Sequence, residues 1–278
     1  MPIALALGGG AALGWAHIGV LRALEEAGVD VGGVAGTSIG ALAAVSFAAR
    51  RLDTLEHIAR TAGWLRVLSY LDLHMKPGAL LGGRTILREL ELHFGEMRFQ
   101  DLWMPAATVA ADLTSGEAVI ADRGFVVPAI MASMAIPGLF RPVRSDGRFL
   151  VDGGVVAPVP VAAARTIAPG LPIVSVNLQG DYAGRKRVSA IRERPAGAHS
   201  TMAVVRASTM LLMSELARAS LAIDPPDLAL TLPVGHVDIH DFTKADMLIE
   251  IGRQSVFEAL PAILDLAARP VTKAKALR

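Results

Sequence analysis

Two short apolar segments, each followed at once by glycines and then by a helical pattern, constrain the fold of this chain more than any other feature. Ile3 to Leu7 form a continuous apolar run that ends at Gly8-Gly9-Gly10, which is typical of a strand buried on both faces. A helical period begins at Leu13, and a second strand is expected over Val31 to Ala35, with another helix from Ile39. Strands that alternate with helices in this way predict a parallel α/β sheet.

The rest of the chain continues this pattern without an internal repeat or a clear linker. We therefore expect one domain over residues 1–278, in which helices sandwich a central, mostly parallel sheet. A polar, basic loop is expected over about 179–200, followed by a helical C-terminal part. The further expected strands lie near 107–113, 117–121, 148–151 and 171–178, and the further helices near 53–94 (with interruptions), 126–135, 201–222 and 244–268.

Composition removes several classes of function. Hydrophobic residues make up 53% and charged residues 19% of the chain, so a disordered protein is excluded. The 27 Lys and Arg against 26 Asp and Glu give a net charge of +1, which does not indicate a nucleic-acid partner. Without cysteine there are no disulfides, thiolate metal sites or cysteine nucleophile. The histidines show no metal-ligand spacing, so we expect neither a metal nor a cofactor.

The apolar content raises the question of a membrane span. The charge-free stretch Val31 to Ala49 is long enough to cross a bilayer, but glycines interrupt it as in a turn between two buried elements. The N-terminus also lacks the basic start of a signal peptide. We expect a soluble, cytoplasmic protein, and peripheral membrane contact and the oligomeric state stay open.

The segment Gly36-Thr37-Ser38-Ile39-Gly40 is G-x-S-x-G between an expected strand and an expected helix, the context in which this pattern forms a nucleophile elbow. A sharp turn projects the Ser38 hydroxyl above the sheet, and Gly36 and Gly40 remove side chains that would collide with neighbouring backbone. The turn also places the Ile39 N–H near a developing oxyanion. The alternative is an ordinary tight turn without catalytic function.

A nucleophilic serine needs a base, and Asp152 is the stronger candidate. It follows the apolar run Phe149-Leu150-Val151 and precedes Gly153-Gly154, as expected at a strand end, where open parallel sheets place their chemistry. An ordinary turn aspartate that caps a helix is the alternative. His236 and His240 do not lie in an obvious late loop after an acid, but they remain open as bases.

The glycine-rich segment from Gly8 to Gly14 joins the first strand to the first helix, where successive backbone N–H groups attract anions. Two nucleotide-binding patterns fail on spacing. Leu13 stands where the dinucleotide pattern needs a small residue, and Trp15 stands where a P-loop needs lysine. An oxyanion loop facing Ser38 remains, against a tight connection that binds nothing.

Taken together, these segments resemble the patatin-like phospholipase family, particularly its small bacterial members, over roughly the first 180 residues. The matching motifs are Leu7 to Leu21, Ala35 to Ala41, Ala132 to Gly138, Phe140 to Val143 and Val151 to Gly154. The resemblance implies a Ser–Asp dyad hydrolase that needs neither a catalytic histidine nor calcium. It implies that Ser38 is the nucleophile, that Asp152 is the base, and that Gly9, Gly10 and Ala11 donate to the oxyanion.

The expected function is therefore that of a serine acyl hydrolase acting on lipid or other carboxylic esters, an esterase or phospholipase A-like enzyme that passes through an acyl-enzyme. Leu13 departs from the family, which usually has Arg or Lys at this position. That departure supports one alternative, a catalytically weak binding or regulatory protein. An acyltransferase would use the same residues and differ only in its products.

Overall fold

The computed structural model describes residues 1–61, 73–76, 79–81, 83–185 and 200–269. One central sheet organises them, and the predicted α/β class with a mostly parallel sheet is confirmed. The strands of this sheet are β1 (Ile3–Leu7), β2 (Val31–Thr37), β5 (Ala106–Asp112), β6 (Ala118–Ala121), β7 (Val143–Ser145), β8 (Arg148–Asp152), β9 (Ile173–Asn177) and β10 (Leu228–Thr231). The helices are α1 (Ala16–Glu26), α2 (Ile39–Ala48), α3 (Leu52–Thr61), α5 (Arg84–Phe94), α6 (Val126–Ser133), α7 (Val161–Ile167), α9 (Thr201–Ile223) and α10 (Ala245–Ala268).

The sheet has a parallel part and an antiparallel part. Its strand order is β10-β9-β1-β2-β5-β8-β7, with β6 also on β5. Strands β10, β9, β1, β2 and β5 pair in parallel, whereas β6 and β8 are antiparallel to β5 and β7 is antiparallel to β8. Sequence reasoning interpreted Asp146-Gly147 as a hairpin turn, and this is confirmed, because β7 and β8 pair antiparallel around these residues. The rule for open parallel sheets was applied to the strand before Asp152, but β8 is antiparallel to β5.

Strand β5 has two neighbours along one of its edges. Strand β6 occupies the other edge of β5 between Thr108 and Ala111. On the first edge Thr37, the last residue of β2, lies opposite Val109, and Asp152, the last residue of β8, lies opposite Ala110. Since β2 is parallel and β8 antiparallel to β5, the two strands run toward each other, and their carboxyl ends meet.

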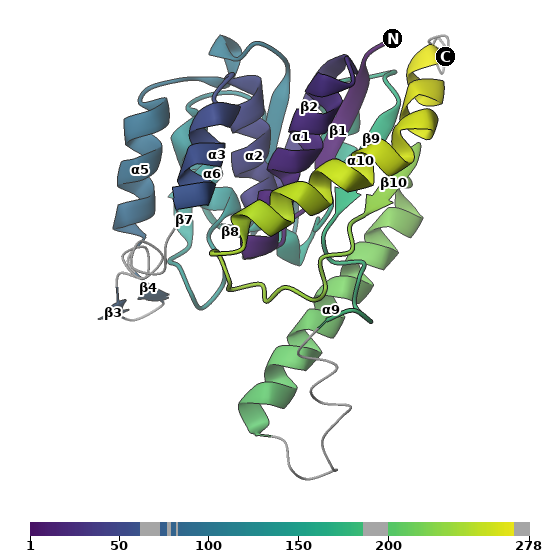
Figure 1. Cartoon of the computed structure of the whole chain (residues 1–278). Coiled ribbons are helices and arrows are strands. Elements are labelled where there is room, and N and C mark those ends of the chain that lie inside the picture. The colour runs from purple at the N-terminus through teal and green to yellow at the C-terminus, as the bar shows by residue number, and fades with distance from the viewer. Residues whose placement is uncertain (62–72, 77–78, 82, 186–199, 270–278) are drawn as a thin grey trace.

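Helices cover both faces of the sheet because its central strands are apolar on both faces. In β1, Ile3, Leu5 and Leu7 pack into the larger core cluster, which contains residues of α1, α2, α3, α5, α6 and α10. Ala4 and Ala6 point to the other face and pack with residues of α7. Figure 1 shows α1, α2, α3 and α10 together in front of the sheet, while α9 extends below the body of the molecule.

Three parts of the chain differ from the predicted elements or lie outside the description. The interrupted helical region expected near 53–94 contains α3 and α5, but also a hairpin of β3 (Leu73–Lys76) and β4 (Ala79–Leu81) that was not expected. Strand β10 was also not expected. Most of the predicted polar loop, residues 186–199, lies outside the described residues. Across the described ranges, none of the helices combines the length and apolar character needed to cross a membrane.

Candidate active site

Ser38 occupies a strained turn between β2 and α2. Its backbone has φ 57° and ψ −126°, a conformation that residues with a Cβ rarely adopt. A Cβ on Gly36 would lie 2.1 Å from the carbonyl oxygen of Gly40, and a Cβ on Gly40 would lie 2.3 Å from that of Leu7. The turn can therefore close only with glycine at both positions, and it holds the serine side chain at the carboxyl end of β2.

The Ser38 hydroxyl meets a carboxylate. Its Oγ donates a hydrogen bond to Oδ2 of Asp152 at 2.5 Å, and the Gly154 N–H donates to Oδ1 at 2.7 Å. Both side chains are buried, with Ser38 7% and Asp152 6% exposed. Burial raises the pKa of the Asp152 carboxyl to about 6, although the hydrogen bonds from Ser38 and Gly154 act in the opposite direction. The carboxylate is thus ionised at pH 7 and is a stronger base than an exposed aspartate.

Ser133 holds the elbow from the opposite side. The Ser38 N–H donates to Ser133 Oγ at 2.9 Å, and the Ser133 hydroxyl donates to the Val109 carbonyl at 2.6 Å. Two residues after Ser133, the Ala135 carbonyl accepts a hydrogen bond from the Asp152 N–H at 2.8 Å. Ser133 lies in the family-like motif Ala132 to Gly138, but no role was assigned to it from the sequence. The available signal was a hydroxyl at the end of an otherwise apolar helical stretch.

The glycine loop lies directly against Ser38, since a Cβ on Gly9 would be 3.3 Å from the Ser38 Cβ. The Gly9 N–H donates to the Pro158 carbonyl at 2.9 Å and is therefore already occupied. Among the described residues, the N–H groups of Gly10, Ala11 and Ile39 have no recorded hydrogen-bond partner. These three donors, rather than Gly9, are the ones that can turn to a ligand.

His17 supports the loop from inside the core. Its Nε2 lies 2.7 Å from the Gly8 carbonyl oxygen, and because a carbonyl can only accept, Nε2 carries the proton. The ring is fully buried, and this burial lowers its pKa to about 4, so His17 is neutral at pH 7. His17 is therefore a core histidine that also fixes the start of the glycine loop.

A second buried side chain holds the next carbonyl of the loop. Gln179 Nε2 donates to the Gly9 carbonyl at 3.2 Å, and Arg185 Nη2 donates to Gln179 Oε1 at 2.6 Å. Sequence reasoning placed Arg185 in a basic loop that is either solvated or a lid or anionic-surface contact, but its side chain is buried, with only 3% exposed. Charge pattern alone predicts exposure, because lysine and arginine are rarely buried.

The alternative bases lie elsewhere. His236 and His240 are exposed, and the His240 ring contacts Asp238 rather than the Ser38 hydroxyl. In the described ranges, no group of three His, Asp or Glu side chains is arranged to hold a metal ion.

A family model described as Patatin-like phospholipase matches residues 5–165, which include every residue of the elbow, the glycine loop and Asp152. The chain belongs to the patatin-like phospholipase family. This membership confirms the resemblance drawn from the sequence motifs.

Relatives of the patatin-like domain occur in bacteria and animals. An uncharacterized NTE family protein of Mycobacterium tuberculosis is 40% identical over 185 residues, covering 66% of this chain and 51% of the relative. Patatin-like phospholipase domain-containing protein 6 of Homo sapiens is 35% identical over 172 residues, covering 59% of this chain and 12% of that protein. The chain thus spans about half the length of its bacterial relative and a much smaller share of the human one.

The patatin-like fold is also similar to a solved structure. VipD from Legionella pneumophila superposes with a TM-score of 0.53, covering 94% of this chain and 67% of VipD at 13% sequence identity. At this identity the similarity concerns the fold alone.

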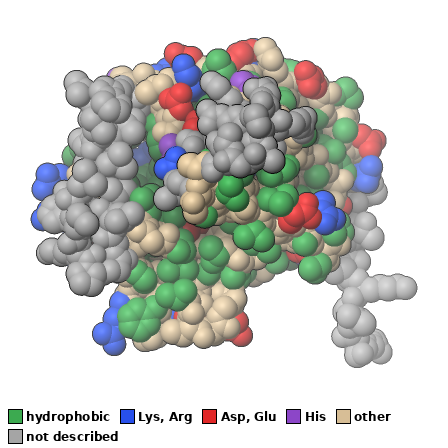
Figure 2. Space-filling view, turned by 90° about the horizontal axis from the view of Figure 1, so that it is seen from below, with side chains coloured by type: hydrophobic (Ala, Val, Ile, Leu, Met, Phe, Trp, Pro, Cys, Tyr) green, Lys and Arg blue, Asp and Glu red, His purple; other side chains and the backbone are tan. Residues whose placement is uncertain are grey.

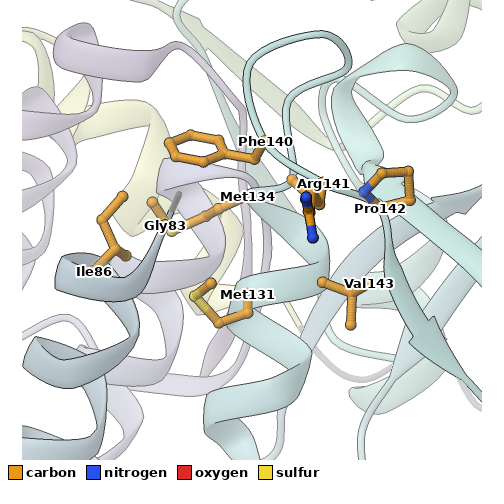
Figure 3. A pocket seen from close by; sticks show the side chains of 9 residues that line it. Gly83, Ile86, Met131, Met134, Phe140, Arg141, Pro142 and Val143 are labelled. Carbon is orange, nitrogen blue, oxygen red and sulfur yellow. The ribbon is translucent and has the colours of Figure 1, made fainter. Parts of the chain in front are cut away.

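The patatin-like domain contains an apolar cavity of about 190 Å³ (Figure 3). Neither Ser38 nor Asp152 lines it, but Ala135, whose carbonyl binds the Asp152 N–H, does. The side chains that surround it come from α5, α6 and the segment leading into β7: Ile86, Met131, Met134, Phe140, Arg141, Pro142 and Val143.

Helix α9 carries a second apolar surface, and one of its residues, Met213, lies close to the Ser38–Asp152 pair. A Cβ on Gly154 would lie 3.5 Å from Cε of Met213, so this helix passes beside the residue that binds Asp152. Figure 2 views the end of the molecule to which the carboxyl ends of the parallel strands point, and hydrophobic side chains gather on it. On α9 the large exposed apolar residues in the first half of the helix are Val204, Val205, Leu211 and Leu212.

Proposed function

We propose that this patatin-like domain is a serine acyl hydrolase that cleaves lipid or other carboxylic esters through an acyl-enzyme on Ser38. The observation that carries the proposal is the 2.5 Å hydrogen bond from the Ser38 hydroxyl to the buried carboxylate of Asp152. A serine bound to a carboxylate of raised pKa, next to unoccupied backbone donors, is the arrangement that acyl transfer needs.

In the first step, Asp152 accepts the Ser38 proton while Oγ attacks the ester carbonyl carbon. The negative charge that develops on the carbonyl oxygen is bound by the N–H groups of Gly10, Ala11 and Ile39. Asp152 then returns the proton to the leaving alcohol as the carbon–oxygen bond breaks. A general base contributes about 10²–10⁴-fold, and one oxyanion donor about 10²–10³-fold.

In the second step, water takes the place of the alcohol. Asp152 accepts a proton from this water, which attacks the acyl carbon, and the same donors bind the second oxyanion. The bond to Ser38 then breaks, the serine recovers its proton from Asp152, and the carboxylic acid leaves. Transfer of the acyl group to an alcohol instead of water would follow the same steps and would make the protein an acyltransferase.

Covalent labelling tests this proposal. A fluorophosphonate probe should modify the protein, and peptide mass mapping should place the adduct on Ser38. Ser38→Ala should lose both labelling and turnover of a short-chain ester, whereas Ser208→Ala, at an exposed position on α9, should keep both. A wild-type protein that resists the probe, or a Ser38→Ala variant with full turnover, would overturn the assignment in favour of a binding or regulatory role.

We further propose that the protein is cytoplasmic and takes its substrate from a phospholipid surface. In this proposal, α9 is the helix that binds the surface. One of its residues, Met213, lies close to the dyad, and the residues from Thr201 to Ser214 contain a single charged side chain, that of Arg206. A helix with exposed apolar residues and one cation is suited to an anionic membrane surface.

Vesicle binding tests the membrane contact without requiring catalysis. The Ser38→Ala protein should co-sediment with phosphatidylglycerol vesicles, and a further Leu211→Glu and Leu212→Glu exchange should abolish this. Met247→Glu, at an exposed apolar position on α10, is the matched control and should leave binding unchanged. If the α9 exchange leaves vesicle binding unchanged but dissociates a dimer in solution, the face binds a second copy instead.

A further inference from the structure

The glycine loop contains no charged side chain of its own, since its sequence from Gly8 to Gly14 is GGGAALG. Leu13, where the family usually has a basic residue, is fully buried in the hydrophobic core. A cation from a distant part of the chain is nevertheless linked to the loop through one side-chain amide. The guanidinium of Arg185 binds Oε1 of Gln179, and Nε2 of the same amide binds the Gly9 carbonyl.

The Gly9 carbonyl and the Gly10 N–H belong to one peptide unit. A hydrogen bond accepted by the carbonyl polarises this unit and makes its N–H a stronger donor, because hydrogen bonds in series strengthen one another. The side-chain amide of Gln179 is polarised in the same way, one hydrogen bond further from the loop. Its oxygen accepts from a cation, so its Nε2–H is also a stronger donor.

The surroundings keep this chain of groups intact. Gln179 and Arg185 are 8% and 3% exposed, so water competes little for their hydrogen bonds. The Gln179 backbone N–H donates to Asn177 Oδ1 at 2.8 Å, which fixes the residue at the end of β9. Burial lowers the pKa of Arg185 and Asp181 opposes this shift, but a guanidinium remains protonated at pH 7.

We infer that Arg185 and Gln179 are positioning residues that transmit a buried positive charge through the Gly9–Gly10 peptide to the oxyanion. This inference rests on the proposed acyl transfer and specifies how its oxyanion donor is strengthened. The Gly10 N–H is the donor that benefits, because the N–H of Gly9 is occupied by Pro158. The charge acts only when negative charge develops on the substrate oxygen, so it should affect kcat rather than KM.

Two variants separate charge from hydrogen bonding. Arg185→Gln keeps a donor for Gln179 but removes the charge, whereas Arg185→Lys keeps the charge. With a short-chain ester, Arg185→Gln should lower kcat by about 3- to 30-fold, a fraction of the effect of a whole oxyanion donor, with KM unchanged, and Arg185→Lys should recover most of the loss. Arg218→Gln, an exposed position on α9, is the matched control and should change neither constant.

Inhibitor affinity distinguishes the proposed role of Arg185 from a purely structural one. A trifluoromethyl ketone forms a negatively charged hemiketal with the serine, and the matching methyl ketone binds without charge. The Ki of the first should rise in Arg185→Gln by the same factor as the fall in kcat/KM, and the Ki of the second should stay constant. If Arg185→Gln is poorly folded by its Tm, Gln179→Met should show the same pattern.

Two results would overturn the inference. One is an unchanged trifluoromethyl ketone Ki in a folded Arg185→Gln protein, and the other is a drop in Tm with no selective loss of the charged adduct. Both leave the proposed function standing if the wild type binds the ketone through Ser38. A wild type that forms no hemiketal would instead reject the proposed function itself.

Discussion

Ser38 and Asp152, which are 114 positions apart in the chain, meet because β2 and β8 run toward each other along the same edge of β5. Thr37 lies opposite Val109 and Asp152 opposite the next residue, Ala110. The register of two strands on a third therefore sets the position of both groups. A dyad fixed by backbone pairing keeps its 2.5 Å contact without help from a flexible loop.

The pH dependence of turnover should report the Asp152 carboxyl. Its pKa of about 6 means that the base is ionised above this pH and is lost by protonation below it. We expect kcat/KM for a short-chain ester to fall tenfold per pH unit below pH 6 and to be flat above it, in a profile measured from about pH 3 to about pH 8.5. An inflection near pH 4 would show that burial does not shift the carboxyl.

Asp152→Asn should abolish turnover, and it should become more stable relative to the wild type as the pH rises. Because the pKa is higher in the folded state than its usual 3.8, the folded protein holds this proton more tightly than the unfolded chain. That stabilisation is complete below pH 3.8 and is lost as pH rises through 6, at a cost of about 1–3 kcal/mol. Urea unfolding of Asp152→Asn and wild type at pH 4 and pH 7 should show a difference that grows toward pH 7 in favour of the variant. A difference independent of pH would contradict this.

The strain at Ser38 predicts an order of stability between two inactive variants. A backbone at φ 57° and ψ −126° costs a residue with a Cβ about 1–3 kcal/mol, and glycine avoids most of this cost. Ser38→Gly should therefore have a free energy of unfolding about 1 kcal/mol higher than Ser38→Ala, measured in urea. Both lack the hydroxyl, so the comparison isolates the backbone. Equal stabilities would mean that the elbow relaxes once the dyad is gone.

Ser133→Ala should weaken the elbow without touching the dyad. The exchange leaves the Ser38 N–H and the Val109 carbonyl without their buried partner, which costs about 1–3 kcal/mol of unfolding free energy. We expect a lower Tm and a lower kcat, because Ser38 is then free to move away from Asp152. Ser208→Ala, on the surface of α9, should change neither quantity. Unchanged kcat in Ser133→Ala would show that the glycines alone hold the turn.

The apolar cavity should select the length of the acyl chain if it receives that chain. Met131→Ala enlarges the cavity and should shift the preferred p-nitrophenyl ester toward longer acyl chains, while Val143→Phe fills it and should shift the preference toward shorter ones. Met247→Ala, on the surface of α10, is the control. A chain-length profile that neither cavity variant changes would place the acyl chain elsewhere.

Local sequence patterns were sufficient for much of the framework. The apolar runs predicted β1 and β2, the helical period predicted α1, and the glycines flanking Ser38 predicted a sharp turn, since each signal depends on neighbours a few residues apart. The same reasoning missed β10, and it applied the rule for parallel sheets to β8, which is antiparallel to β5. A short strand has no local feature that says whether it pairs in parallel or antiparallel.

Only the tertiary structure determined which polar groups contact each other. Asp152 was identifiable as a strand-end carboxylate, but its contact with Ser38 depends on the β5 register. The Gly9 N–H was predicted as an oxyanion donor and is instead bound by Pro158, and Arg185 was placed in a polar, basic loop and is buried. A residue's type and neighbours determine its own chemistry, whereas its partners and its pKa depend on packing between segments far apart in the chain.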